Sequence, residues 1–134
     1  MKYLALDIGE ARVGVAASDE SGIVVRPLTY IQVGNKLMAE LGKIIEEEKP
    51  GKVIFGIPRH QNGEEGEAAP QIRSFSDVVR HEFSVGVDFE DESATTVEAI
   101  ARLKEQKVPR EKYKELVDAE AAAVILESYL SRQK

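Results

Sequence analysis

The sequence contains no cysteine. This absence excludes disulfides, thiolate-bound metals and cysteine nucleophiles, and it agrees with a reducing compartment. Long apolar runs are also absent: Asp7 interrupts the first one, and no segment approaches the ~20 apolar residues of a membrane span. The N-terminus has no basic region followed by a long apolar stretch, as a secretion signal would have. We therefore expect a cytoplasmic protein with no membrane segment.

The length of 134 residues suits one domain, 1–134, which can bury roughly two-thirds of its unfolded surface without a disulfide or metal staple. The net charge of −6 argues against a protein that coats nucleic acid over its whole surface. One segment departs from this balance. Residues 102–114 contain six basic residues, among them Lys104, Lys107 and Arg110, against two acidic ones. This segment is either a nucleic-acid contact or a solvated helix end.

Apolar patterning divides the chain into strands and helices. Short runs of β-branched, aromatic and other apolar residues predict strands at 3–7, 12–18, 23–33, 52–57 and 85–91. Apolar residues at helical spacing predict helices at 35–49, about 70–83 and 95–106, and a last helix from 118. The turn-rich segment 58–66 is expected to form a loop.

This order predicts an α/β fold. Three strands joined by short turns should form a meander, and strands that follow helices should join the first strand in parallel. The result is a mixed five-stranded sheet with helices on both faces. Ligands bind at the carboxyl ends of parallel strands in open sheets of this kind, so that edge is the expected site.

Three aspartates are placed for chemistry at that edge. Asp7 ends a strand that is apolar enough to be buried on both faces, where an unpaired charge is costly. Asp91 ends the apolar face of the strand at 85–91, and Asp118 shares a face of the last helix with Ala121, Ala122 and Ile125. Together they would repel one another unless Mg²⁺ or Mn²⁺ bound them, and two such ions can activate water at a phosphodiester. The alternatives are a strand-end residue for Asp7 and a helix cap for Asp118.

Four ordered segments also resemble one family. DIGEARVGVAASD, GIPRHQNGEEG, DESATTVEA and VDAEAAAVILESYL are similar, in order and spacing, to the motifs of the YqgF family, also called RuvX. The resemblance covers nearly the whole chain. It implies a fold similar to ribonuclease H and to RuvC-type resolvases, and a nuclease that matures the 5′ end of pre-16S ribosomal RNA or resolves Holliday junctions in branched DNA. Nucleic acid, and with it ribosome assembly particles, are the implied partners of a monomer or weak homodimer.

Carried over by motif, Asp7, Asp91 and Asp118 match the family's acidic residues. Arg12 matches the family's basic residue before Val-Gly-Val, and Arg12 and Arg59, which lies in the loop at 58–66, are candidates to contact the nucleic-acid backbone. Glu92 is either a further metal ligand or a partner for Arg12.

One residue departs from the family pattern. Ser93 stands where the family usually has arginine, so any phosphate contact made by that arginine is missing or comes from elsewhere.

Two other functions stay open from the sequence. DIGEARVG also resembles the first phosphate-binding hairpin of actin-like ATPases, although those proteins typically enclose a nucleotide between two such domains. The third possibility is a non-catalytic module that assists ribosome assembly. Three intact aspartates argue against it, and Ser93 argues for it.

Overall fold

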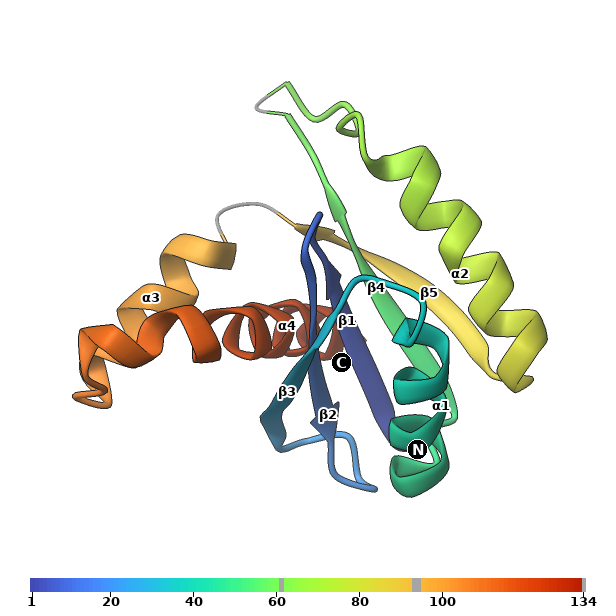
Figure 1. Cartoon of the computed structure of the whole chain (residues 1–134), viewed down its shortest axis with the longest axis horizontal. Coiled ribbons are helices and arrows are strands. Elements are labelled where there is room, and N and C mark those ends of the chain that lie inside the picture. The colour runs from blue at the N-terminus through green and yellow to red at the C-terminus, as the bar shows by residue number, and fades with distance from the viewer. Residues whose placement is uncertain (61, 93–94, 134) are drawn as a thin grey trace.

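A computed structural model describes residues 1–60, 62–92 and 95–133 of the chain (Figure 1). Ser93, with its expected consequence for phosphate binding, lies outside the described residues. The elements follow one another as β1 Tyr3–Ile8, β2 Arg12–Ser18, β3 Val25–Gln32, α1 Leu37–Glu48, β4 Lys52–Pro58, α2 Ala69–Phe83, β5 Gly86–Glu92, α3 Thr95–Glu105, the 3₁₀ turn η1 Arg110–Lys112 and α4 Tyr113–Arg132. This order confirms the predicted succession of strands and helices.

The strands form one mixed sheet in the order β3-β2-β1-β4-β5. The pairs β1–β2 and β2–β3 are antiparallel, whereas β1–β4 and β4–β5 are parallel. The predicted meander and the parallel crossover strands are thus confirmed. The strands of Asp7 and Asp91 are not direct neighbours, because β4 lies between β1 and β5.

Helices cover both faces of the sheet, as expected (Figure 1). Alternate residues of the strands separate into two cores, as the two-residue period of a strand requires. Leu4, Leu6 and Phe55 pack with residues of α1 and α2. Ala5 and Ile54 face the other way, toward Ile125, Leu126 and Tyr129 of α4. α3 packs against α4 on that second side.

The last helix lies unusually close to the sheet. A Cβ atom added at Gly14 of β2 would lie 1.9 Å from the carbonyl oxygen of Asp118, so only glycine fits under this turn of α4. Further along, Ala16 of β2 packs against Ala122 and Ala123. These small side chains bring the backbone of α4, and Asp118 with it, down onto the sheet beside β1. Across the described residues, every helix is too short or too polar to cross a bilayer.

Candidate active site

Asp7 lies near the carboxyl end of β1, on the face that α4 covers, because it shares the parity of Ala5. Its antiparallel neighbour is Gly14. On the other side lies β4, whose last residue in register with β1 is Phe55, opposite Leu6. The next residue of β4, Gly56, therefore lies beside Asp7. Asp7 therefore sits in a hollow of the sheet, with a glycine strand position on each side. Burial raises its pKa, a hydrogen bond with Glu92 acts in the opposite direction, and the negative charge of Asp118 raises it further.

Glu92, the last residue of β5, is the carboxylate that meets Asp7. The side chains of β5 that alternate with it toward α4 include Asp88, which accepts a hydrogen bond from Tyr129 Oη at 2.7 Å. Gly56 leaves room for the Glu92 side chain, since a Cβ atom there would lie 3.0 Å from Oε2. Thr95 Oγ1 donates to Glu92 Oε1 over 3.4 Å.

A proton is shared between these two carboxyls. Burial first, and then the hydrogen bond and negative charge of Asp7, raise the pKa of Glu92 to about 9. Glu92 is therefore protonated at neutral pH and donates to Asp7 when no cation lies between them. Metal binding requires ionised ligands, so an ion that bound at this pair would have to displace the proton.

Asp118 completes the acidic group from α4. The helix begins at Tyr113, so the prediction that it begins at Asp118 is wrong, and Asp118 lies in the second turn rather than at a cap. Its Oδ2 accepts a hydrogen bond from Arg12 Nε at 2.6 Å. The close approach at Gly14 holds this turn of α4 beside Asp7, and the charge of Asp118 acts on the Asp7 carboxyl.

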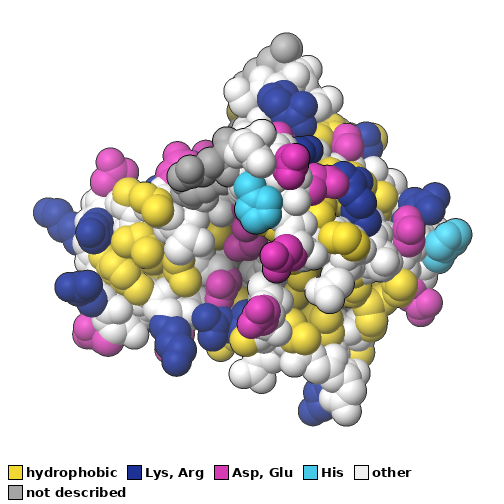
Figure 2. Space-filling view, turned by 90° about the horizontal axis from the view of Figure 1, so that it is seen from above, with side chains coloured by type: hydrophobic (Ala, Val, Ile, Leu, Met, Phe, Trp, Pro, Cys, Tyr) yellow, Lys and Arg dark blue, Asp and Glu magenta, His cyan; other side chains and the backbone are white. Residues whose placement is uncertain are grey.

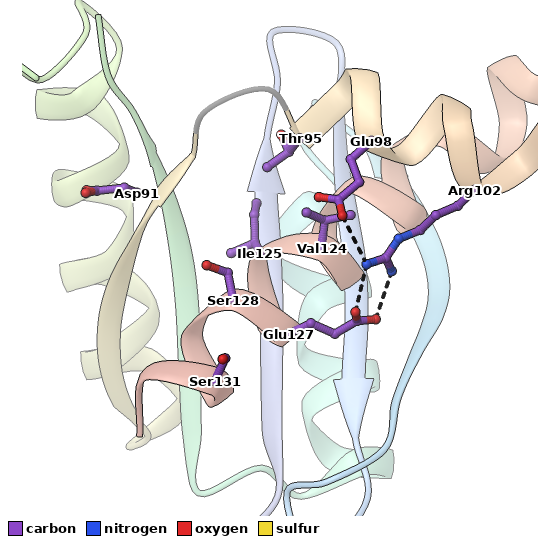
Figure 3. A pocket seen from close by; sticks show the side chains of 9 residues that line it. All are labelled: Asp91, Thr95, Glu98, Arg102, Val124, Ile125, Glu127, Ser128 and Ser131. Atoms are coloured by element: carbon purple, nitrogen blue, oxygen red, sulfur yellow. Dashed lines mark hydrogen bonds and ion pairs between the residues drawn. The ribbon is translucent and has the colours of Figure 1, made fainter. Parts of the chain in front are cut away.

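Asp91 does not join this group, and the expectation that it does is corrected by the structure. It pairs in register with Ile57, whose side chain belongs to the core under α1 and α2, so Asp91 faces away from α4. Its side chain is 62% exposed and forms an ion pair with Arg59. In Figure 3 it points away from the other labelled side chains. Glu92, one residue further, has the opposite parity and takes the place predicted for Asp91.

The two arginines predicted to contact nucleic acid are both bound to carboxylates. Arg59 Nε donates to Asp91 Oδ1, and Arg59 Nη1 donates to the Gly63 carbonyl at 2.9 Å, which fastens the loop after β4 to the end of β5. Arg12 bonds Asp118, and its Cζ lies 5.9 Å from the centre of the Tyr30 ring. Both cations lie at the edge of the sheet where β1 and β4 end.

The basic residues Lys104, Lys107 and Arg110 are exposed near the connection between α3 and α4. This connection lies at the far end of the helical pair from the sheet (Figure 1). Seen from above, several Lys and Arg side chains lie along the outer side of the lobe formed by these helices, with acidic side chains among them, and further acidic side chains lie near the middle of the surface (Figure 2). The structure thus places these three residues away from the acidic group, at the far end of the helical pair.

A cavity of about 400 Å³ opens next to Thr95, between β5, α3 and α4. Arg102 crosses it and binds Glu127 through two hydrogen bonds of 2.8 and 2.7 Å, with Glu98 at 3.7 Å (Figure 3). These contacts fix α3 against α4. They also hold Thr95, the first residue of α3, where its hydroxyl reaches Glu92.

The donor set fits a hard divalent cation. Asp7, Glu92 and Asp118 supply carboxylate oxygens from three elements, and such ligands select ions like Mg²⁺ and Mn²⁺. In the described residues, no group of three or more acidic or histidine side chains is yet arranged to hold an ion. Asp118 is bound instead to Arg12, and the raised pKa of Glu92 keeps a proton on the pair that it forms with Asp7. An ion that bound here would have to displace the proton of the Asp7–Glu92 pair and loosen the contact between Arg12 and Asp118.

The whole chain matches one family of known proteins. Residues 1–132 match the family model described as RuvX, Holliday junction resolvase. A Leuconostoc citreum protein named "Putative pre-16S rRNA nuclease" is 37% identical over 135 residues, which cover 97% of this chain and 94% of the relative. A Thermoanaerobacter pseudethanolicus protein of the same name is 36% identical over 137 residues, covering 100% of this chain and 99% of the relative.

Solved structures agree on the fold. RuvC of Thermus thermophilus, in complex with a Holliday junction substrate, superposes with a TM-score of 0.57 at 16% identity, covering 99% of this chain and 96% of RuvC. The fowlpox virus resolvase in complex with Holliday junction DNA gives a TM-score of 0.63 at 14% identity, covering 99% of each chain. These structures share the ribonuclease H-like sheet that the sequence predicted. With its family match and its full-length relatives, the chain belongs to the RuvX family of nucleases.

Proposed function

We propose that the protein hydrolyses phosphodiester bonds in structured nucleic acid, with Mg²⁺ or Mn²⁺ bound by Asp7, Glu92 and Asp118. The observation that carries this proposal is the meeting of the three carboxyls on the α4 face of the sheet, where Asp7 and Glu92 hold a proton that a cation can replace. The bound ion would supply Lewis-acid activation of water and of the scissile phosphate.

The chain's own residues prepare this chemistry. Gly14 and Gly56 have no side chains beside Asp7, and the space this leaves is taken by the α4 backbone at Asp118 and by Ile125 and the Glu92 carboxyl. Thr95 orients the Glu92 carboxyl from the side away from Asp7. Arg12 stands at the acidic group as a cation that can pass from Asp118 to a substrate phosphate when an ion takes its place.

The substrate we favour is the 5′ end of pre-16S rRNA, within ribosome assembly particles, because the relatives that match at full length carry that name. Branched DNA is the second candidate, and the description of the matched family favours it. Both substrates are structured, and both present phosphates to the same carboxylates. The choice between them depends on the surface around the site and not on its chemistry.

The test compares cleavage by wild type, Asp7→Asn and Asp77→Asn. Purified proteins are given a precursor 16S transcript and a four-way DNA junction, each with Mg²⁺ or Mn²⁺. We expect Asp7→Asn to lose cleavage, since the amide cannot replace the anionic ligand. Asp77→Asn removes an exposed carboxylate of α2 and should cleave as wild type does. Full activity of Asp7→Asn would reject the proposal, and the preferred substrate of the wild type would decide between RNA and DNA.

A further inference from the structure

A second cavity of about 400 Å³ lies between β3, α3 and α4. Its size falls in the range of small-molecule pockets, roughly 300–1,000 Å³. The residues that line it and enter the argument are Tyr30, Leu103, Gln106, Leu116, Ala119 and Glu120. The walls are thus an aromatic ring and aliphatic side chains, with a few polar groups among them. No step proposed for phosphodiester cleavage uses this cavity.

Glu120 is the feature that points to a ligand. It is only 6% exposed, yet within the described part of the chain no hydrogen bond or ion pair holds its carboxylate. The nearby cation is Arg102, whose guanidinium feels the charge of Glu120 but is already engaged by both oxygens of Glu127. Among the described residues, no side-chain oxygen is both fully buried and without a partner, so the Glu120 oxygens keep access to solvent, and Glu120 lines the cavity. An acceptor-only carboxylate in a cavity wall favours a ligand that brings N–H groups.

The cavity is connected to the catalytic edge through the sheet register. Tyr30 of β3 is the neighbour of Gly14 on β2, and Gly14 is the neighbour of Asp7 on β1. At a strand spacing of about 4.8 Å, Tyr30 lies roughly 10 Å from Asp7. Glu120 follows Asp118 by two positions on α4, so the two side chains leave the helix about 200° apart and Glu120 faces the side away from Asp118. On the side of Tyr30, a nucleotide close to a phosphate bound at Asp7 can still reach the cavity.

We propose that this cavity receives an unstacked nucleobase of the substrate whose edge presents two adjacent N–H donors, as guanine does with N1–H and the N2 amino group. The inference rests on the proposed function, because nucleic acid must be the substrate. An aromatic wall for the base face and a carboxylate for its Watson–Crick edge are the features with which proteins read single-stranded bases. Glu120 is thereby a specificity-determining residue for the nucleotide beside the scissile phosphate.

The test uses mononucleotides without metal, so that it is independent of cleavage. Binding of guanosine 5′-monophosphate is compared with inosine 5′-monophosphate, which lacks the N2 amino group, and with uridine 5′-monophosphate. We expect wild type to bind the guanosine nucleotide tighter than the inosine nucleotide, by roughly tenfold for a bidentate base contact. Glu120→Gln should remove this difference, whereas Glu105→Gln, an exposed carboxylate of α3 outside the cavity, should keep it.

A second measurement needs no variant. In amide NMR spectra of the wild type, the guanosine nucleotide should shift signals of Tyr30, Gln106 and Leu116. Equal binding of all three nucleotides, or shifts elsewhere only, would overturn the assignment. The same shifts produced by an arginine-containing peptide and not by nucleotides would assign the cavity to a protein partner and overturn it too. Asp7→Asn should keep the nucleotide preference. Loss of cleavage would therefore test the proposed function, and loss of the nucleotide preference would test the base pocket, so the two failures can be told apart.

Discussion

At the scale of single residues, the central feature is the contact between Asp7 and Glu92. Two carboxyls from different strands meet in a partly buried hollow, and one of them keeps its proton at neutral pH. Such a pair has little structural advantage, because a hydrophobic pair of similar size would fill the hollow at a lower desolvation cost. The pair is better explained as a cation site.

The proton held by Glu92 makes the metal-free protein sensitive to pH. Its pKa rises from 4.5 to about 9 on folding, so the folded state binds this proton more tightly than the unfolded state. The stability that this provides is complete below the unfolded pKa and disappears as pH rises through the folded pKa. With a chelator present, the free energy of unfolding should therefore fall between about pH 5 and pH 9, by up to about 1.4 kcal/mol per pH unit.

Denaturant titrations at several pH values check this. Glu92→Gln removes the titrating group and should flatten the fall, whereas Glu67→Gln, an exposed carboxylate, should leave it in place. A wild-type protein that grows more stable across this range would show that Glu92 is ionised in the folded state.

The sequence predicted Asp7 and Asp118 but favoured Asp91 over Glu92. Period-two alternation correctly put Asp91 on the face of Val87 and Phe89. What alternation could not show is which face of the sheet Asp7 occupies, since β1 is buried on both faces and has no polar side. Only the packing of α4 on the sheet identifies that face. Glu92 of β5 lies on the same face, whereas Asp91 lies on the other.

At the scale of elements, the approach of α4 to the sheet builds the site. The helix comes within contact of the β2 backbone at Gly14, so its register decides where Asp118 lies. Glycine is needed here for space and not for its backbone angles.

Gly14→Ala should therefore damage both stability and metal binding. The added methyl group would lie 1.9 Å from a backbone oxygen, and overpacking of this kind costs about 1–3 kcal/mol or more. Thermal melts with and without Mn²⁺ measure both effects. Gly34→Ala is the matched control, because a methyl group there meets nothing within 4 Å. Unchanged stability and metal response in Gly14→Ala would mean that α4 does not rest on β2 at this point.

Most elements could be predicted because their apolar faces are regular. The start of α4 could not, since its first turn is poorly buried: Lys114, Glu115 and Leu116 are exposed. With no apolar stripe there, the helical pattern begins only near Asp118, and the predicted start of the helix fell on that residue. Because the first turn of α4 was not predicted, Asp118 stood at the start of the predicted helix, where an aspartate resembles a helix cap.

At the scale of the whole molecule, the acidic group lies at the sheet edge, and the connection of α3 and α4 forms a lobe in which residues 102–114 include six basic residues against two acidic ones. Lys and Arg side chains lie along the outer side of this lobe, with acidic side chains among them (Figure 2). A net charge of −6 is compatible with nucleic-acid binding only if contacts are confined to such a lobe. Lys104, Lys107 and Arg110 are exposed there and remain our prediction for the substrate backbone.

Neutralising these three residues to glutamine should weaken binding of structured RNA at every sequence. The slope of log affinity against log salt should fall by about 1 for each phosphate that the protein no longer neutralises. Fluorescence anisotropy over a salt series measures the slope, with uncleaved substrate in chelator. The control changes Lys36, Lys43 and Lys49, around α1 on the other side of the sheet, and should leave the slope unchanged. If both triple variants behave alike, the lobe does not bind the substrate backbone.

The most direct measurement compares Glu92→Gln with Asp91→Asn in Mn²⁺ thermal melts. Both variants remove one carboxyl at neighbouring positions of β5, but only Glu92 meets Asp7. A ligand that binds only the folded state stabilises it by about 2.7 kcal/mol at a hundredfold excess over its Kd. We expect wild type and Asp91→Asn to gain stability together and Glu92→Gln to gain little. A full gain in Glu92→Gln with none in Asp91→Asn would contradict the proposed metal site.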